Sequence, residues 1–73
     1  MENIMSDTET RATDLKTWRE GKGWKQVEAA RFIGISATHY GMIERHAMTP
    51  RADLAKRIID KTGVTLEGIL GAA

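Results

Sequence analysis

The chain has 73 residues, no cysteine, one proline and 41% hydrophobic residues. So short a chain forms one small domain, because dividing it would leave neither part a hydrophobic core. These numbers exclude a large enzyme and any disulfide or thiolate metal site, and they predict a fold stabilised by close helix packing or oligomerisation. No apolar run reaches the roughly 18 residues of a membrane span, and residues 1–10 lack a signal-peptide pattern. We therefore expect a cytoplasmic protein.

Charge is divided unevenly along the chain. Residues 1–10 hold three acidic residues and no basic one, a net charge of −3. Residues 11–73 hold all 11 Lys and Arg and seven acidic residues, a net charge of +4. We expect a mobile acidic arm over residues 1–12 and a basic domain over residues 13–73. A positive surface suits a nucleic acid, and solvated surface charges are the alternative explanation.

Hydrophobic spacing and capping residues predict two helices in the first half of the domain. The first covers about residues 13–21, with Thr13 as its N-cap and Gly21 and Gly23 as the residues that end it. The second covers about residues 25–33 and ends at Gly34, which can take the left-handed conformation. The apolar positions are Leu15 and Trp18 in the first helix, and Val27, Ala30 and Ile33 in the second.

Three more helices are predicted after residue 35, which makes the chain all-α. One covers about residues 37–45 after the N-cap Ser36. The next covers about residues 50–62, with Thr49 as N-cap and Pro50 at the first helical position. A short helix follows Thr65. The apolar positions are Tyr40 and Ile43, then Leu54, Ile58 and Ile59, then Leu66, Ile69 and Leu70.

The second and third helices are joined by only three residues, Gly34, Ile35 and Ser36. So short a connection makes the helices cross steeply, which predicts a helix-turn-helix over about residues 25–45. A longer pattern of residues in fixed order surrounds this motif. It consists of Leu-Lys-Thr-Trp-Arg at 15–19, Gly-Trp-Lys-Gln at 23–26, Ala30, Gly-Ile-Ser at 34–36, Tyr40, Ile-Glu-Arg at 43–45 and Pro50.

This pattern resembles the Cro/C1-type (Xre) family of helix-turn-helix transcriptional regulators, and the resemblance covers residues 15–70. It implies a compact, five-helix, lambda-repressor-like domain. It also implies an ion pair between Arg19 and Glu44, partly buried, with two solvated charges as the alternative. Gln26 matches the family's glutamine that contacts a DNA phosphate and supports the recognition helix.

The third helix has an inner and an outer side. At 100° per residue, Tyr40 and Ile43 face inward, and Thr38, Met42 and Arg45 face outward. The outer side is the candidate reading face, suited to thymine methyl groups and DNA shape more than to guanine edges. The candidate DNA-binding residues are Lys25, Gln26, Ser36, Ala37, Thr38, His39, Gly41, Met42 and Arg45.

Two residues depart from local rules and call for a compensating contact. Gly41 lies inside a helix, where glycine costs about 0.5–1 kcal/mol relative to alanine. Lys25 is the expected N-cap of the second helix, where a cation opposes the helix dipole. Close approach of the backbone to DNA would explain Gly41, and an adjacent phosphate would explain Lys25. Tolerance in a stable scaffold is the alternative for each residue.

These features predict a sequence-specific, double-stranded-DNA-binding transcriptional regulator that acts at the nucleoid as a homodimer, under control of its own concentration or a regulatory protein partner. The dimer surface is expected near Leu66, Ile69 and Leu70, with closure of the core as the alternative. The competing function is a protein-protein or antitoxin-like adaptor on the same fold, with a partner docked at Tyr40, Met42 and Met48.

No catalytic site, metal site or cofactor is predicted. The histidines, His39 and His46, are seven residues apart, about 10.5 Å along one helix, which is too far to share a metal ion. The sequence Gly-Lys-Gly at 21–23 lacks the spacing of a phosphate-binding loop. We expect a protein that binds DNA and carries out no reaction.

Overall fold

The computed structural model describes residues 14–71, which form five helices and no strand. The predicted all-α class is therefore confirmed. The predicted acidic arm, residues 1–12, lies outside the described residues, as does Thr13. The N-cap of the first described helix is Asp14, whose carboxylate accepts from the Thr17 N–H at 2.9 Å, so the prediction of Thr13 as the cap is wrong. The helices are α2 (Leu15–Lys22), α3 (Gln26–Ile33), α4 (Ala37–Glu44), α5 (Ala52–Thr62) and α6 (Leu66–Leu70).

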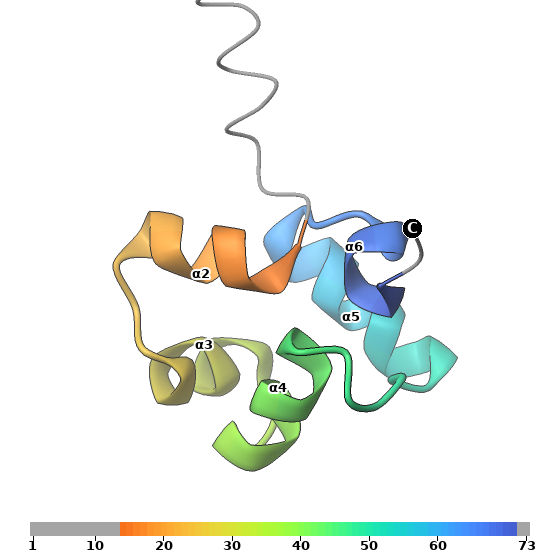
Figure 1. The fold of residues 1–73 in the computed structure, drawn as a ribbon, viewed down its shortest axis with the longest axis horizontal. Helices are drawn as coiled ribbons and strands as arrows, with labels where there is room; N and C mark the ends of the chain where they lie inside the picture. Colours follow the sequence, from red (N-terminus) through yellow and green to blue (C-terminus); the bar gives the residue numbers. More distant parts are fainter. Residues whose placement is uncertain (1–13, 72–73) are drawn as a thin grey trace, which may run out of the picture.

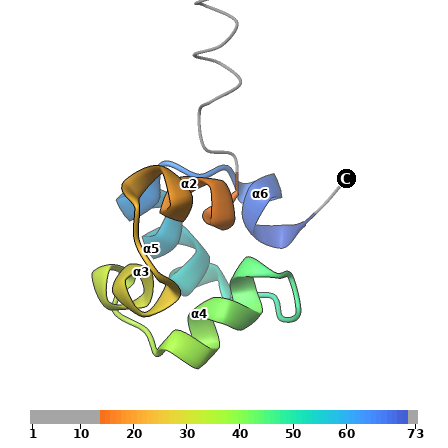
Figure 2. The same ribbon diagram turned by 60° about the vertical axis from the view of Figure 1, so that its left-hand side comes forward.

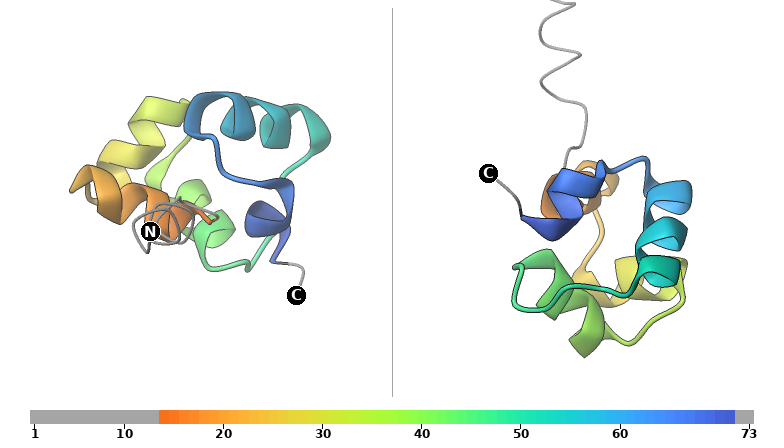
Figure 3. Two further views of the ribbon diagram at one scale, coloured as in Figure 1. Left: turned by 90° about the horizontal axis from the view of Figure 1, so that it is seen from above. Right: turned by 90° about the vertical axis from the view of Figure 1, so that its right-hand side faces the viewer.

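The five helices surround a single core, with α4 at one end of the domain. Figure 1 and Figure 2 show α4 at the lower edge and α2 and α6 at the opposite end. Seen from above, α3 and α5 line one side of the domain and α2 and α6 the other (Figure 3). The core combines side chains from every helix: Leu15, Trp18, Ala29, Ala30, Ile33, Tyr40, Ile43, Ile58, Val64 and Ile69.

Most predicted apolar positions face this core, and three do not. Val27 is 47% exposed, and Ala29 takes the inward position beside Ala30. Leu66 and Leu70 are 47% and 40% exposed, and only Ile69 of α6 is buried. Leu66, Ile69 and Leu70 share one apolar stripe of α6, and only the Ile69 side of this stripe reaches the core.

At two other helix ends the structure differs from part of the prediction. Gly21 lies inside α2, and Gly23 ends the helix at a φ of 74°. The helix predicted to begin at Pro50 begins at Ala52. Pro50 is buried, and Arg51 remains extended at φ −67° and ψ 163°, so the backbone becomes helical only after it.

His46 connects the end of α4 to α6. Among residues 14–71 it is the only residue other than glycine with a positive φ, 61°. Its Nε2 lies 2.9 Å from the Gly68 carbonyl oxygen, and its ring leaves no room for a side chain at Gly71, where an added Cβ would stand 2.8 Å from His46 Cγ. Histidine tolerates this backbone region better than most residues, and the hydrogen bond to Gly68 stabilises it there.

Candidate nucleic-acid interface

A tight turn sets the angle between α3 and α4. Gly34 ends α3 at a φ of 98°, a left-handed conformation that residues with a side chain rarely adopt. Its N–H donates to the Ala30 carbonyl at 2.8 Å, and the N–H of Ile35 donates to the same oxygen at 3.0 Å. Arg57 of α5 also donates to the Ile33 carbonyl at 3.4 Å. These hydrogen bonds therefore fix the orientation of α4 relative to α3.

Ser36 begins α4 as its N-cap. Its backbone is extended, and its Oγ accepts a hydrogen bond from the His39 N–H at 3.0 Å. This bond satisfies one of the amide groups that a helix start leaves without a partner. Ser36 is exposed, so its hydroxyl hydrogen can still be donated to an outside acceptor.

The two sides of α4 differ in burial. Tyr40 and Ile43 are fully buried, as the angular pattern indicates. The candidate reading residues on the other side reach solvent to different degrees. Ser36, Ala37, Thr38 and Arg45 are exposed, and His39 and Met42 are half-buried.

Gly41 differs from the predicted arrangement, because it is buried under two side chains. A Cβ at Gly41 would stand 3.3 Å from Gln26 Oε1 and 3.6 Å from an Arg45 guanidinium nitrogen. Glycine at this position therefore lets Gln26 lie against α4. This contact within the chain explains Gly41 without DNA.

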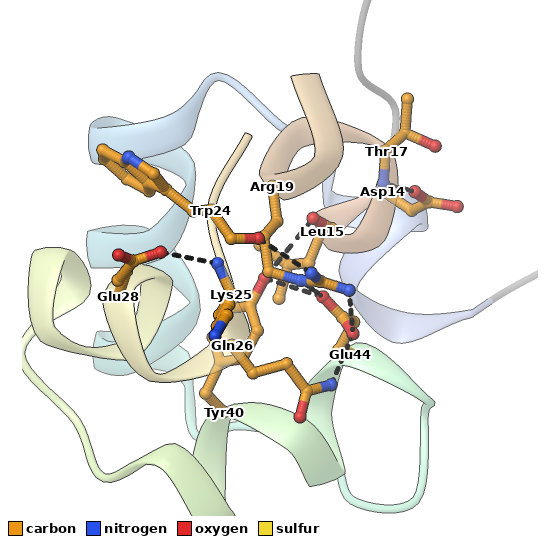
Figure 4. Close-up of polar contacts among 10 residues, drawn as sticks. All are labelled: Asp14, Leu15, Thr17, Arg19, Trp24, Lys25, Gln26, Glu28, Tyr40 and Glu44. Atoms are coloured by element: carbon orange, nitrogen blue, oxygen red, sulfur yellow. Dashed lines mark hydrogen bonds and ion pairs between the residues drawn. The ribbon is translucent and has the colours of Figure 1, made fainter. Parts of the chain in front are cut away.

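The Glu44 carboxylate of α4 accepts hydrogen bonds that link α2, α3 and α4 (Figure 4). Arg19 of α2 donates from Nε to Glu44 Oε2 at 2.7 Å and from Nη2 to Oε1 at 3.2 Å. Gln26 of α3 donates to Oε1 at 2.7 Å, and the Tyr40 hydroxyl donates to Oε2 at 2.9 Å. The Arg19 and Glu44 side chains are only 15% and 6% exposed, so the pair is largely shielded from water.

The network shifts the pKa values of its members. Burial alone would raise the pKa of Glu44, and hydrogen bonds from Arg19, Gln26 and Tyr40 outweigh it, so the Glu44 pKa lies below its ordinary value. The bond to Glu44 raises the pKa of Arg19. Burial, then the bond to Glu44, raises the pKa of Tyr40. At neutral pH the network therefore holds one carboxylate, one guanidinium and a neutral phenol.

Lys25 is the N-cap of α3, and it lacks a side-chain cap of its own. Its N–H instead donates to Glu28 Oε1 at 2.7 Å. The Glu28 carboxylate also lies in the first turn of α3, where a negative charge is favourable. Glu28 thus compensates for lysine at the cap, and Lys25 itself is exposed.

A pocket of about 330 Å³ flanks the beginning of α4, between the turn and the start of α5. His39 lines it, so the histidine faces the α5 side of the reading face. Sequence reasoning did not identify this pocket, because its walls come from segments far apart in the chain. The lining residues are Ile35, His39, Met48, Arg51, Asp53, Leu54 and Arg57.

Within residues 14–71, His, Cys, Asp and Glu side chains do not gather in a group of three that could hold a metal ion. The same residues include no helix long and apolar enough to cross a membrane. His39 and His46 point to different neighbours, the pocket and α6 respectively.

Comparison with known proteins agrees with this geometry. A family model described as "Helix-turn-helix" matches residues 15–69, from the start of α2 to α6. No curated protein and no solved structure matches the chain. The matched region covers most of the chain and includes the turn, α4 and the Glu44 network. The chain belongs to the Cro/C1-type (Xre) helix-turn-helix family, a family of DNA-binding regulators.

Proposed function

We propose that the protein regulates transcription by inserting α4 into the major groove of duplex DNA as a homodimer. One observation supports this most strongly: α4 packs Tyr40 and Ile43 into the core and leaves Thr38 and Arg45 exposed at an outer edge of the domain. The network around Glu44 holds the helix rigidly in that position.

Phosphate contacts would set the register on DNA. Lys25, Gln26, Ser36 and Arg45 offer cations and hydrogen-bond donors around the two ends of α4, where the DNA strands would pass. Gly41 leaves room for Gln26 against α4, because a Cβ there would stand 3.3 Å from Gln26 Oε1. The Gln26 amide therefore supports the recognition helix and remains partly exposed to an incoming phosphate.

Base reading would come from the middle of the exposed side. Thr38 offers a hydroxyl and a methyl group, Ala37 a methyl group, and Met42 a half-buried apolar tip. His39 would contact DNA from the pocket side. These groups favour thymine methyl contacts and DNA shape, because none makes the bidentate contacts by which Arg reads guanine.

The homodimer would form through α6. Leu66 and Leu70 lie one turn apart on its outer side and are exposed, whereas Ile69 closes the core. Two exposed leucines at this spacing suit a contact with the same surface of a second copy. To read two half-sites, the dimer would need its two copies of α4 about one helical turn of DNA apart.

The competing adaptor function needs Tyr40 to contact a partner. Tyr40 is fully buried and donates to Glu44, so it is not available on that surface. The Met42 and Met48 side chains are half-buried and offer little apolar area by themselves. This arrangement favours DNA over a protein as the ligand of the α4 face.

Salt dependence separates the two functions. Binding of the full chain to a labelled duplex is measured by fluorescence anisotropy between 50 and 200 mM salt. A dimer that neutralises four phosphates, through Lys25 and Arg45 of each copy, should lose about 10²-fold in affinity over this range. Absent binding, or affinity independent of salt, would contradict the proposal and favour the adaptor.

A further inference from the structure

Three aromatic side chains gather where α2, α3 and the loop between them meet. Trp24 lies 5.7 Å from Trp18 in a T-shaped arrangement and 5.4 Å from Phe32, measured between ring centroids. Trp18 is buried under the other two rings, Trp24 is half-buried, and Phe32 is 42% exposed. The chain has four aromatic residues, so three of them meet at one corner of the domain.

Two lysines border the exposed rings. Lys22 Nζ lies 6.0 Å from the Trp24 ring centroid, and Lys61 Nζ of α5 lies 5.1 Å from that of Phe32. Both distances are within the range of a cation-π contact. Within the described residues, neither lysine forms an ion pair. Trp24, Phe32, Lys22 and Lys61 are called the aromatic patch below.

The acidic residues beside the patch have other partners. Glu28, one turn before Phe32, accepts from the Lys25 N–H, and Asp60, beside Lys61, pairs with Lys56 at 3.2 Å. The aromatic patch therefore combines an open apolar surface with two cations that lack a counter-charge. Exposed aromatic groups of this kind are the residues that contribute most at protein interfaces.

The Trp24 ring of the aromatic patch is directed away from the proposed DNA contact. Figure 4 shows it on the opposite side from the Gln26 side chain, which extends toward α4. A ligand on the patch would leave Thr38 and Arg45 free. The patch is thus placed to be occupied while the protein is on DNA.

We propose that the aromatic patch binds a segment of another protein that carries an aliphatic side chain between carboxylates. The aliphatic group covers Phe32 and Trp24, and the carboxylates pair with Lys22 and Lys61. Charge complementarity identifies this partner, because a basic segment would be repelled by the lysines and a neutral one would leave them without counter-charges. This inference is independent of the proposed DNA contact.

Tryptophan fluorescence gives a local readout, because both tryptophans of the chain lie in the cluster. The probe is a blocked synthetic peptide with two leucines flanked by aspartates, added to the full chain. We expect a saturable change in emission, and no such change with the peptide in which lysines replace the aspartates. No saturable change at millimolar peptide, or equal changes with both peptides, would overturn the proposal.

Variants locate the binding site. Phe32→Ser should weaken binding of the acidic peptide about tenfold or more. The double variant Lys22→Ala, Lys61→Ala keeps both rings and should also weaken this binding. Val27→Ser is the matched control, since Val27 is also an exposed apolar residue of α3 and lies outside the cluster. Circular dichroism checks that each variant is folded. Equal weakening by Val27→Ser, or full binding by the double lysine variant, would contradict the assignment.

Other occupants of the patch give different results. A second copy of the chain would make the emission depend on protein concentration in the absence of peptide. If the chain's own acidic residues occupied the patch, the triple variant Glu2→Gln, Asp7→Asn, Glu9→Gln would differ in emission from the parent chain without peptide. Either result would replace the proposed partner.

Discussion

Arg19 and Glu44 join α2 to the end of α4 through two hydrogen bonds, of 2.7 and 3.2 Å. Because both side chains are largely shielded, removing one leaves the other charge with little water to solvate it. We expect Arg19→Ala or Glu44→Ala to lower the free energy of unfolding by about 3 kcal/mol. Urea denaturation followed by circular dichroism measures this loss.

An exposed ion pair is the control for that prediction. Lys56 and Asp60 of α5 pair at 3.2 Å, and both side chains are mostly exposed. Lys56→Ala should cost less than about 0.5 kcal/mol, because water screens the pair. A cost for Arg19→Ala as small as this would show that the Glu44 network contributes no stability.

Acid should destabilise the protein through Glu44 and Asp14. Both have a pKa below its ordinary value in the folded protein, Asp14 chiefly because the Thr17 N–H donates to it. The unfolded chain therefore takes up protons first, and stability falls as the pH drops from about 4.5 through the folded values. Glu44→Gln should make the unfolding free energy depend less on pH in this range. An unchanged pH profile in that variant would contradict the assignment.

Two glycines within helices should respond differently to alanine. Gly21 of α2 has open space around it, so Gly21→Ala should stabilise the protein by about 0.5–1 kcal/mol. At Gly41 the new Cβ would press on Gln26 Oε1, and displacing Gln26 would offset the gain. We also expect Gly41→Ala to weaken DNA binding about tenfold. If Gly41→Ala stabilised the protein as much as Gly21→Ala and left DNA binding unchanged, the contact of Gln26 with α4 would contribute to neither stability nor binding.

Arg45 and Thr38 should affect DNA binding in different ways. Arg45→Ala should weaken binding of the dimer to all duplexes about equally and reduce the salt slope by about two units, because it removes one phosphate contact in each copy. Thr38→Ala should change the preference among sequences by at most about 1–3 kcal/mol. Anisotropy titrations on a set of duplexes measure both effects. The assignment fails if the roles are reversed or if neither variant changes binding.

Local signals in the sequence were sufficient for the helices and for the turn between α3 and α4. The left-handed glycines Gly23, Gly34 and Gly63 end helices near the predicted places because few other residues adopt that conformation. The predicted start of α5 was wrong because proline fits both the first turn of a helix and the extended segment before it. In the structure Pro50 is buried in the extended segment, and the helix begins at Ala52.

Contacts between distant residues explain what the sequence alone did not reveal. Gly41 and Lys25 drew attention as departures from helix rules, but Gln26 and Glu28 compensate for them inside the chain. The aromatic patch joins Trp24 and Phe32 to Lys61 of α5, and no local pattern connects them. Periodicity reports which side of a helix is apolar, and it does not report which neighbour covers that side.

Amide chemical-shift mapping tests the DNA contact of α4 most directly. The isotopically labelled full chain is titrated at low salt with a duplex of about 20 base pairs, long enough for two half-sites. We expect the largest shifts at Thr38, Met42 and Arg45, with smaller shifts at Lys25 and none at Phe32. Large shifts confined to the aromatic patch, or no shift along α4, would contradict the account.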